Sequence, residues 1–455
     1  MSVIGAAPVL ADPARRALDP PSRVLADAVA QGLVRFDAAG QIEPGIAERW
    51  TVIDNGMSYI FRLRDARWAD GAPVTAAEVA AALRRQLARD SRNPLLPFLS
   101  AVQDVVEMTP EVIEVRLSRP RPDLLKLFAQ PELAVARQRS NGGTGPFRLA
   151  SRSGAALLLR PALDAAADPD AARPTPEDEV RLRGEAAARS VARFAAGHAD
   201  LVLGGSFADW PLVGASGAAP ADVRVDPAAG LFGLAIVSRE GFLADPANRD
   251  ALASVFDREA IAASFGQWTP ADTIVPDMLD SAVAPNPPAW AAVPLDQRRS
   301  DARARVQAWQ AGQSGPLVLR IALPPGPGAT LLWGHIGAAL LGVGITPERV
   351  AMDAPAELRL VDAVAPYDSA RWYLATACRP CGPEAAAALD VAREAPTLPA
   401  RAQALAAAEA AVAADAPFIT LARPLRWSLV GARLREWQPN ARAWHPLNHL
   451  RNDPT

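Results

Sequence analysis

The sequence predicts a mixed α/β protein in which helices pack against sheets, and three observations support this. Half of the 455 residues are hydrophobic and 21% are charged, so the chain can bury a sizeable core. Helix-like and strand-like patterns alternate along the chain, most regularly in its second half. The 43 prolines divide it into many short elements. At about 150 residues per domain, this length corresponds to two or three domains.

The first half carries both periodicities. Apolar residues at helical spacing predict helices, which we expect at 22–31, 76–88, 124–128 and 185–196. Alternating apolar and polar residues predict strands, which we expect at 32–36, 59–64, 112–117, 147–150 and 200–203. Thr75 and Glu78 have the spacing of a capping box, in which Thr75 is the N-cap and Glu78 reaches back to its amide.

The second half alternates more clearly between the two element types. Pro399 is well placed to open a long alanine-rich helix, because proline is favoured at the first helical position. Helices are expected at 249–256, 258–265, 302–310, 330–341 and 399–414. Strands are expected at 231–237, 317–323, 358–361, 418–421 and 427–430.

Charge and hydropathy exclude two classes of protein. The formal net charge is −3, so no basic field is available to hold a phosphate backbone, and nucleic acid is not the expected partner. No apolar run approaches the roughly 18 residues that span a bilayer, so the sequence does not predict a membrane-integral protein.

Residues 1–11 are apolar and end in Val-Leu-Ala, which resembles a signal-peptidase site, but the segment lacks a basic start. They are either a remnant of an export signal or an ordinary apolar segment.

Motifs for catalysis are weak. The glycines at 142–145 lead into a strand without a following Lys-Ser/Thr, so they predict a tight turn rather than a phosphate loop. Cys378 and Cys381 form a C-x-x-C pair. In an exported protein, a short-range disulfide is a better interpretation of this pair than a redox-active motif or a zinc site. His445 and His449 are read as surface residues. We therefore expect no catalytic residues, no metal and no cofactor.

Tryptophan placement favours a binding function instead. Aromatic side chains near predicted element ends together suit a ligand cleft, although for each one taken alone a core or surface role is the favoured interpretation. They are Trp210, Trp268, Trp333, Trp372 and Trp427.

Several segments resemble the family 5 extracytoplasmic solute-binding proteins, the peptide- and nickel-binding components of ABC importers. The strongest runs from PGIAERW at 44–50 through YIFRLR at 59–64 to WADGAPVTAAEV at 68–79. GTGPF at 143–147 and DAPFI at 415–419 match later family motifs in the same order. The resemblance covers nearly the whole chain.

This resemblance implies a bilobed periplasmic-binding-protein fold of type II, cluster C, with an extra third domain. Domain I would comprise residues 1–40, 141–237 and 425–455, domain II residues 41–140, and domain III residues 238–424. The chain would cross between lobes near Val237 and near Leu425, and a solute would be held between domains I and III.

Two departures affect the expected solute. Peptide-binding members carry a W-x-A-D-Y segment whose aspartate binds the peptide α-ammonium. In the simplest alignment, Val361 stands for the tryptophan and Val364 for the aspartate. Asp362 or Asp368, in the loop expected after strand 358–361, could replace that anchor, with Trp333, Tyr367 and Trp372 as apolar walls. Ile236-Val237-Ser238 replaces a second family motif, so we expect a less common solute, or a peptide held differently, rather than a peptide bound by a standard amino terminus.

The family resemblance therefore implies a periplasmic, monomeric receptor that passes a peptide or peptide-like solute to an ABC permease and ATPase complex in the membrane. We do not expect an enzyme. A sensory or chaperone-like binding protein that never meets a permease is the alternative, and an enzyme built on the same scaffold is a more remote one.

Overall fold

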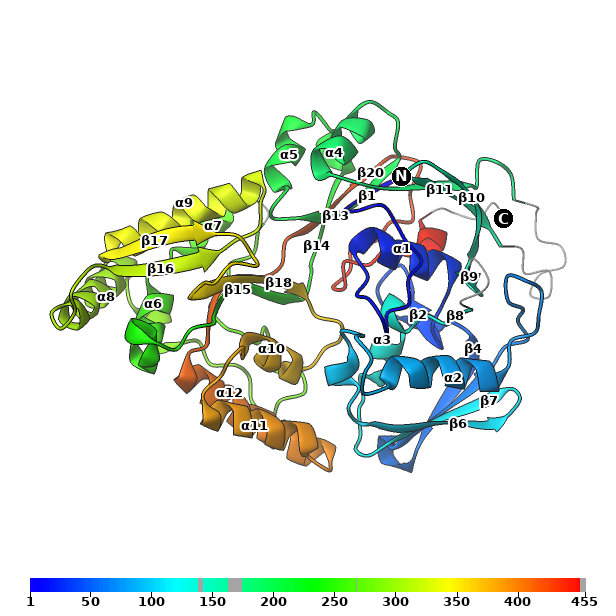
Figure 1. The fold of residues 1–455 in the computed structure, drawn as a ribbon, viewed down its shortest axis with the longest axis horizontal. Helices are drawn as coiled ribbons and strands as arrows, with labels where there is room; N and C mark the ends of the chain where they lie inside the picture. The colour runs from blue at the N-terminus through cyan, green and yellow to red at the C-terminus, as the bar shows by residue number, and fades with distance from the viewer. Residues whose placement is uncertain (138–141, 163–173, 267, 451–455) are drawn as a thin grey trace. The chain divides into compact units, whose positions relative to one another are not determined.

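Separate sheets organise two units of the chain in this computed structural model, which describes residues 1–137, 142–162, 174–266 and 268–450 (Figure 1). Unit 1 contains residues 1–205, 216–226 and 427–455, and unit 2 contains residues 206–215 and 227–426. The chain passes between the units after residues 205, 215, 226 and 426. The proposed boundary at 140/141 lies outside the described residues, and the division of the chain into three domains stays a prediction.

A seven-stranded sheet forms the centre of unit 1, in the order β10-β11-β12-β1-β13-β20-β14. The strands are β1 Ser2–Ile4, β10 Phe147–Ser153, β11 Ala156–Pro161, β12 Val180–Glu185, β13 Leu201–Ser206, β14 Val223–Asp226 and β20 Arg426–Val430. Strand β1 runs parallel to both β12 and β13, so the start of the apolar segment 1–11 belongs to the folded sheet. Helix α1 (Pro20–Val29) buries Leu25 and Val29 in the core of this sheet.

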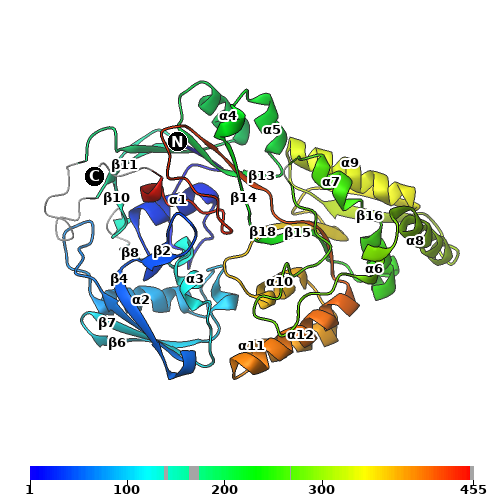
Figure 2. The same ribbon diagram turned by 180° about the vertical axis from the view of Figure 1, so that it is seen from behind.

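A second sheet of unit 1 is antiparallel, in the order β4-β5-β7-β6, with α2 (Ala76–Leu87) packed against β6 and β7 (Figures 1 and 2). Its strands are β4 Ala47–Ile53, β5 Ser58–Leu63, β6 Val102–Thr109 and β7 Val112–Leu117. The remaining elements of unit 1 are β2 Val34–Phe36, β3 Ile42–Pro44, β8 Ala136–Arg137, β9 Gly142–Gly143, α3 Leu124–Phe128 and α4 Ala187–Ala195.

Unit 2 is built on a five-stranded mixed sheet in the order β17-β16-β18-β15-β19. The strands are β15 Gly230–Ile236, β16 Leu317–Ala322, β17 Ile345–Val350, β18 Leu358–Val364 and β19 Phe418–Ala422. Every residue of β15 is buried, as expected for a strand with partners on both sides and elements packed on both faces. The helices are α5 Trp210–Ala215, α6 Pro246–Ser254, α7 Arg258–Ala263, α8 Leu295–Gln310, α9 Pro327–Gly342, α10 Ala370–Ala377, α11 Pro383–Glu394 and α12 Leu398–Asp415.

Most expected elements form within a few residues of their predicted bounds, and the differences have local causes. Helix α8 begins at Leu295 rather than 302, because its first two turns are polar and carry no apolar periodicity. Glu185 ends β12 instead of opening a helix, and its carboxylate accepts hydrogen bonds from Arg193. Strands such as β1 and helices such as α10 and α11 were not predicted.

The capping box at the start of α2 is half confirmed. The Thr75 hydroxyl accepts a hydrogen bond from the Glu78 amide at 3.4 Å, as predicted for an N-cap. The Glu78 carboxylate instead accepts from Trp68 Nε1 at 2.9 Å and pairs with Arg137. Through the pair of Glu78 and Arg137, the segment 68–79 is therefore held against strand β8.

The prediction that both C-terminal histidines are surface residues is wrong for His445 and holds only in part for His449. His445 is 6% exposed and lies 3.0 Å from Asp226 through Nε2, and the half-buried His449 lies 2.8 Å from Glu43. Packing of the final segment within unit 1 buries His445. None of the helices in the described part of the chain is long and apolar enough to cross a membrane.

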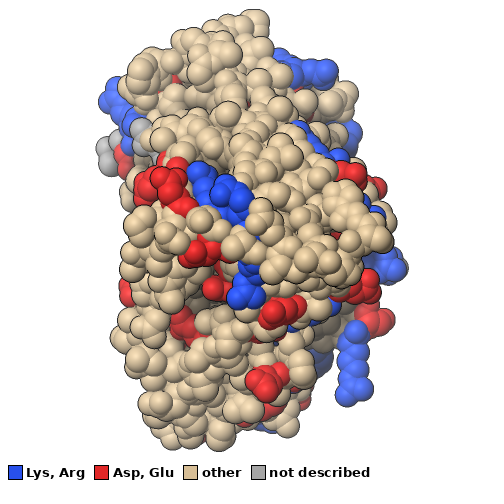
Figure 3. Space-filling model, turned by 90° about the vertical axis from the view of Figure 1, so that its left-hand side faces the viewer, with Lys and Arg blue, Asp and Glu red and all other residues tan. Residues whose placement is uncertain are grey.

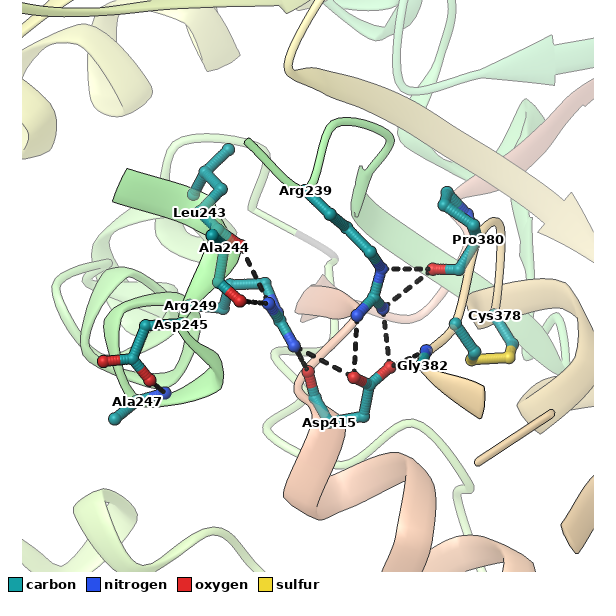
Figure 4. Close-up of polar contacts among 11 residues, drawn as sticks. Arg239, Leu243, Ala244, Asp245, Ala247, Arg249, Cys378, Pro380, Gly382 and Asp415 are labelled. Atoms are coloured by element: carbon teal, nitrogen blue, oxygen red, sulfur yellow. Dashed lines mark hydrogen bonds and ion pairs between the residues drawn. A yellow bond between two sulfur atoms is a disulfide. The ribbon is translucent and has the colours of Figure 1, made fainter. Parts of the chain in front are cut away.

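Asp415, at the end of α12, joins four separate segments of unit 2 (Figure 4). Its carboxylate accepts hydrogen bonds from Arg239 Nη1 at 2.7 Å, Arg249 Nη2 at 2.9 Å and the Gly382 amide at 2.8 Å. Arg239 also donates to the Pro380 carbonyl, between the two cysteines. Burial alone would raise the pKa of Asp415, but the Arg239 hydrogen bond, the Gly382 amide and the two positive charges together lower it.

Cys378 and Cys381 form the short-range disulfide that the sequence predicted. Closing so small a ring removes little conformational entropy from the unfolded chain. We therefore expect the double substitution Cys378→Ser/Cys381→Ser to cost about 2 kcal/mol in free energy of unfolding. Thiol titration of the unreduced, denatured protein checks the bond itself. Two free thiols under those conditions would contradict it.

Asp415→Asn should destabilise the protein more, by about 3 kcal/mol at pH 7, because it removes the counter-charge of Arg249, whose side chain is 2% exposed. Since the folded-state pKa of Asp415 is lowered, its contribution is present above the unfolded pKa of about 3.9 and is lost as pH falls further. Urea unfolding of both proteins at pH 7 and pH 3 measures the difference.

The matched control is Asp390→Asn, whose carboxylate pairs with Arg393 on the surface at 62% exposure. That change should cost less than about 0.5 kcal/mol. Equal losses for the two variants would show that the Asp415 network is not a special source of stability.

Candidate functional site

Strand β18 ends at Val364, three residues beyond the predicted end, and this changes the setting of Asp362. Asp362 was expected in a loop but lies within the strand, opposite Phe232 of β15. Side chains alternate along a strand, so Asp362 and Val364 point to the same face of the sheet. Asp362 therefore lies on the same face, two residues before the position where the family's aspartate is expected.

The Asp362 carboxylate already has a cationic partner. Arg426, the first residue of β20, donates from Nη1 to Oδ1 at 2.8 Å and to Oδ2 at 3.0 Å. The two side chains are only 15% and 18% exposed. Burial raises the pKa of Asp362 above its usual value, and the charge and hydrogen bond of Arg426 oppose that rise. The negative charge of Asp362 is thus matched inside the protein.

Asp280 and Arg401 fix the turn between β18 and α10. Asp280 accepts hydrogen bonds from the Ser369 hydroxyl at 2.7 Å and the Ala370 amide at 2.8 Å, and pairs with Arg401 Nη2 at 2.9 Å. Ser369 is fully buried, so this turn is held from inside the unit. The arrangement gives the neighbouring Asp368 a defined backbone position.

The predicted aromatic walls fall in two places. Tyr367 is 5% exposed and Trp372 is 4% exposed, and Trp372 packs edge-on against Tyr373 at 4.9 Å between ring centroids. Trp333 is half-buried on α9, which packs on the edge strand β17, two strands away from β18. In both views α9 and α10 lie on opposite sides of this sheet (Figures 1 and 2). The structure therefore places Asp362, Tyr367, Asp368 and Trp372 along one stretch of chain, with Trp333 elsewhere in unit 2.

An aromatic cluster beside the same strands was not predicted as a unit. Trp268 packs edge-on against Phe232 and against Phe265, each with 4.5 Å between ring centroids, and stacks on Phe207 at 5.9 Å. Its indole Nε1 donates to the carbonyl of Arg423. The cluster adjoins Asp362 through Phe232, which is its cross-strand partner.

Two arginines near the end of unit 2 were also missed by sequence reasoning. Arg423 donates to the Ile274 carbonyl at 3.1 Å and to Thr273 Oγ1 at 3.2 Å, and burial lowers its pKa. Burial also raises the pKa of nearby Tyr373 to about 12. A signal was present in the sequence, because Arg423 and Arg426 flank Leu425, near which the chain was expected to cross between lobes.

No group of three or more metal-ligating side chains occurs among the residues that the structure describes. Figure 3 shows acidic and basic side chains interspersed across one face of the molecule, with wide uncharged areas between them. That face presents no field of a single sign, in keeping with the formal charge of −3. The β18 region combines a matched ion pair, Asp362 with Arg426, and buried aromatic side chains.

Comparison with known families decides the identity. The profile for bacterial extracellular solute-binding proteins, family 5 Middle, matches residues 41–307, which is more than half of the chain. The chain belongs to this family.

Among curated members of family 5, a probable deoxycholate-binding periplasmic protein of Escherichia coli is 31% identical over 121 residues, or 23% of each chain. The periplasmic oligopeptide-binding protein of Haemophilus influenzae is 36% identical over 111 residues, 24% of this chain and 20% of its own. These matches span less than a quarter of the length of the relatives, which are named as periplasmic binding proteins.

Solved structures of family-like proteins extend the comparison to the whole fold. Haemophilus influenzae OppA with the peptide RPPGFSPFR matches with a TM-score of 0.80 at 19% identity, covering 99% of this chain and 97% of its own. NikA of Brucella suis with Fe(III)-EDTA matches with a TM-score of 0.77 at 17% identity, over the full length of both chains. The predicted bilobed periplasmic-binding-protein fold is confirmed.

Removing Arg426 should leave the buried charge of Asp362 without its cationic partner. We expect Arg426→Met to raise the pKa of Asp362 further, so that the folded protein holds a proton which the unfolded chain has released. Stability then falls as pH rises through the folded-state pKa. The loss of free energy of unfolding should be about 3 kcal/mol at pH 8 and clearly smaller at pH 5.

Arg359→Met is the matched control, because Arg359 lies on the same strand as Asp362, donates to the Ala354 carbonyl and forms no ion pair with a carboxylate of the described residues. Its cost in free energy of unfolding should be the same at both pH values, as should that of Arg426→Met combined with Asp362→Asn. A pH-independent loss for Arg426→Met alone would contradict the charge pairing.

Proposed function

We propose that this family 5 protein is the solute receptor of an ABC importer, capturing a peptide-like solute outside the cytoplasm and delivering it to a membrane permease and ATPase. The family match over residues 41–307 carries the proposal. The bilobed fold supports it, because proteins of this architecture bind ligands by domain closure. Its relatives are named for binding oligopeptides, murein peptide, glutathione and deoxycholate, so the family admits varied solutes.

A periplasmic location agrees with the cysteine chemistry. Disulfides form and persist in oxidising compartments such as the bacterial periplasm and are rare in the cytosol. Cys378 and Cys381, the two cysteines of the chain, are joined. The names of the curated relatives point to the same compartment.

The solute we propose is not an ordinary peptide held by its α-ammonium. A carboxylate anchors an ammonium group strongly only if its charge is available, since charge-assisted hydrogen bonds depend on it. In the simplest alignment with the family, Val364 stands at the anchor position, and the neighbouring Asp362 is paired with Arg426 on both oxygens. Asp368 and the aromatic side chains Trp333, Tyr367 and Trp372 remain proposed contacts for the solute.

Calorimetry with trialanine and N-acetyl-trialanine tests the anchor. We expect no binding tighter than about 1 μM for either peptide, and equal affinities within about threefold, because Asp362 is paired with Arg426 and we propose that Asp368 contacts another part of the solute than a free amino terminus. The substitutions Asp362→Ala and Asp368→Ala should therefore not alter the ratio of the affinities for trialanine and N-acetyl-trialanine. Tenfold tighter binding of the free peptide, lost in either variant, would contradict the proposed solute class.

Native mass spectrometry of protein purified from its own host tests the receptor function. We expect a mass excess of a few hundred daltons that is lost on denaturation, and a released molecule that rebinds unchanged. A released molecule that the protein converts to a different mass would indicate an enzyme instead.

A further inference from the structure

Unit 1 contains a cavity of about 520 Å³ that the proposed solute site does not use. This volume lies within the range of small-molecule pockets in proteins, about 300–1,000 Å³. Its walls come from the segment after β1, from α1, from the end of α2, from residues 131–137 and from β10. All of these elements are labelled in Figure 1 and belong to unit 1.

Part of the cavity lining is apolar. Leu10 and Leu149 line the cavity and pack against the core of the seven-stranded sheet. Val9, another lining residue, is 40% exposed. Alanines at five lining positions leave room that larger side chains would fill, and they are Ala11, Ala26, Ala30, Ala134 and Ala136.

The lining also includes four arginines and one aspartate, and only part of this charge is matched internally. Arg85 pairs with Asp12 at 3.1 Å, and Arg137 pairs with Glu78 and with Asp70. The exposed guanidinium groups of Arg15 and Arg152 have no ion-pair partner among the described residues. Two unmatched positive charges therefore lie on the rim of a half-apolar cavity.

Hydrogen bonds hold the walls in place without a ligand. The Val9 amide donates to Ser22 Oγ of α1 at 3.0 Å. Asp12 accepts from Gln86 of α2 at 2.8 Å, and the Ala14 carbonyl accepts from the Arg92 amide at 2.8 Å. The segment carrying Val9 and Arg15 is thus tied to two helices, and a preformed site lowers the entropic cost of binding.

We propose that this cavity binds a small amphipathic anion, an organic carboxylate with an apolar body. The carboxylate pairs with Arg15 and Arg152, whose planar guanidinium groups match its geometry, and the apolar body lies against Val9, Leu10 and Leu149. A cationic ligand of equal size would be repelled by the same arginines. The site goes beyond the proposed function, because it lies wholly in unit 1 and uses none of the residues of the β18 region.

Calorimetry with octanoate and with octyltrimethylammonium, at low ionic strength and below their micellar concentrations, tests the proposal. Octanoate should bind with one-to-one stoichiometry, and the cation should not. Arg15→Ala and Arg152→Ala should each weaken octanoate binding by about tenfold, since each removes a charge-assisted contact. Ala134→Trp, which fills the cavity from a half-exposed position, should abolish binding while the melting temperature is retained.

Arg16→Ala is the matched control, because Arg16 is the exposed neighbour of Arg15 and does not line the cavity. Its octanoate affinity should equal that of the unsubstituted protein. Equal binding of anion and cation, or octanoate binding that survives Ala134→Trp, would overturn the proposal. The solute retained in native mass spectrometry should be unchanged in all of these variants, so a failure here is distinguishable from a failure of the proposed receptor function.

Discussion

Asp415 is the point on which the structure of unit 2 depends most. One carboxylate links the segment after β15, helix α6, the end of α12 and the loop that contains the disulfide. Arg249 is almost fully buried, so its charge is tolerable only because Asp415 and three backbone carbonyls surround it. This network fixes the ends of β15 and β19, two neighbouring strands of the sheet that also contains β18.

A second buried ion pair joins Asp362 and Arg426 in the candidate site. Because Arg426 neutralises Asp362, this carboxylate is not available to bind the α-ammonium group of an ordinary peptide. The aromatic cluster around Trp268 and the turn at Ser369 are buried beside this ion pair. With the charge of Asp362 matched, the proposed aromatic contacts suit a solute recognised by its apolar body rather than by a charged amino terminus.

Much of the fold was predictable, because α2, β7 and α12 carry strong periodicity, caps or proline at the right positions. The family resemblance supplied the architecture. What sequence could not supply was pairing over long separations: β1 is too short to show a period, and its strand identity comes from β12 and β13. Likewise Asp362 was a candidate anchor by type and position, and only the fold brings Arg426, 64 residues away, to its carboxylate.

The most direct test of this account is a crystal structure of the protein with its co-purified solute. We predict that both oxygens of Asp362 remain bonded to Arg426 and that no ammonium group of the solute contacts Asp362. A structure in which Asp362 leaves Arg426 and pairs with an ammonium of the bound solute would contradict the central claim, because the chain would then anchor its ligand as a peptide receptor does.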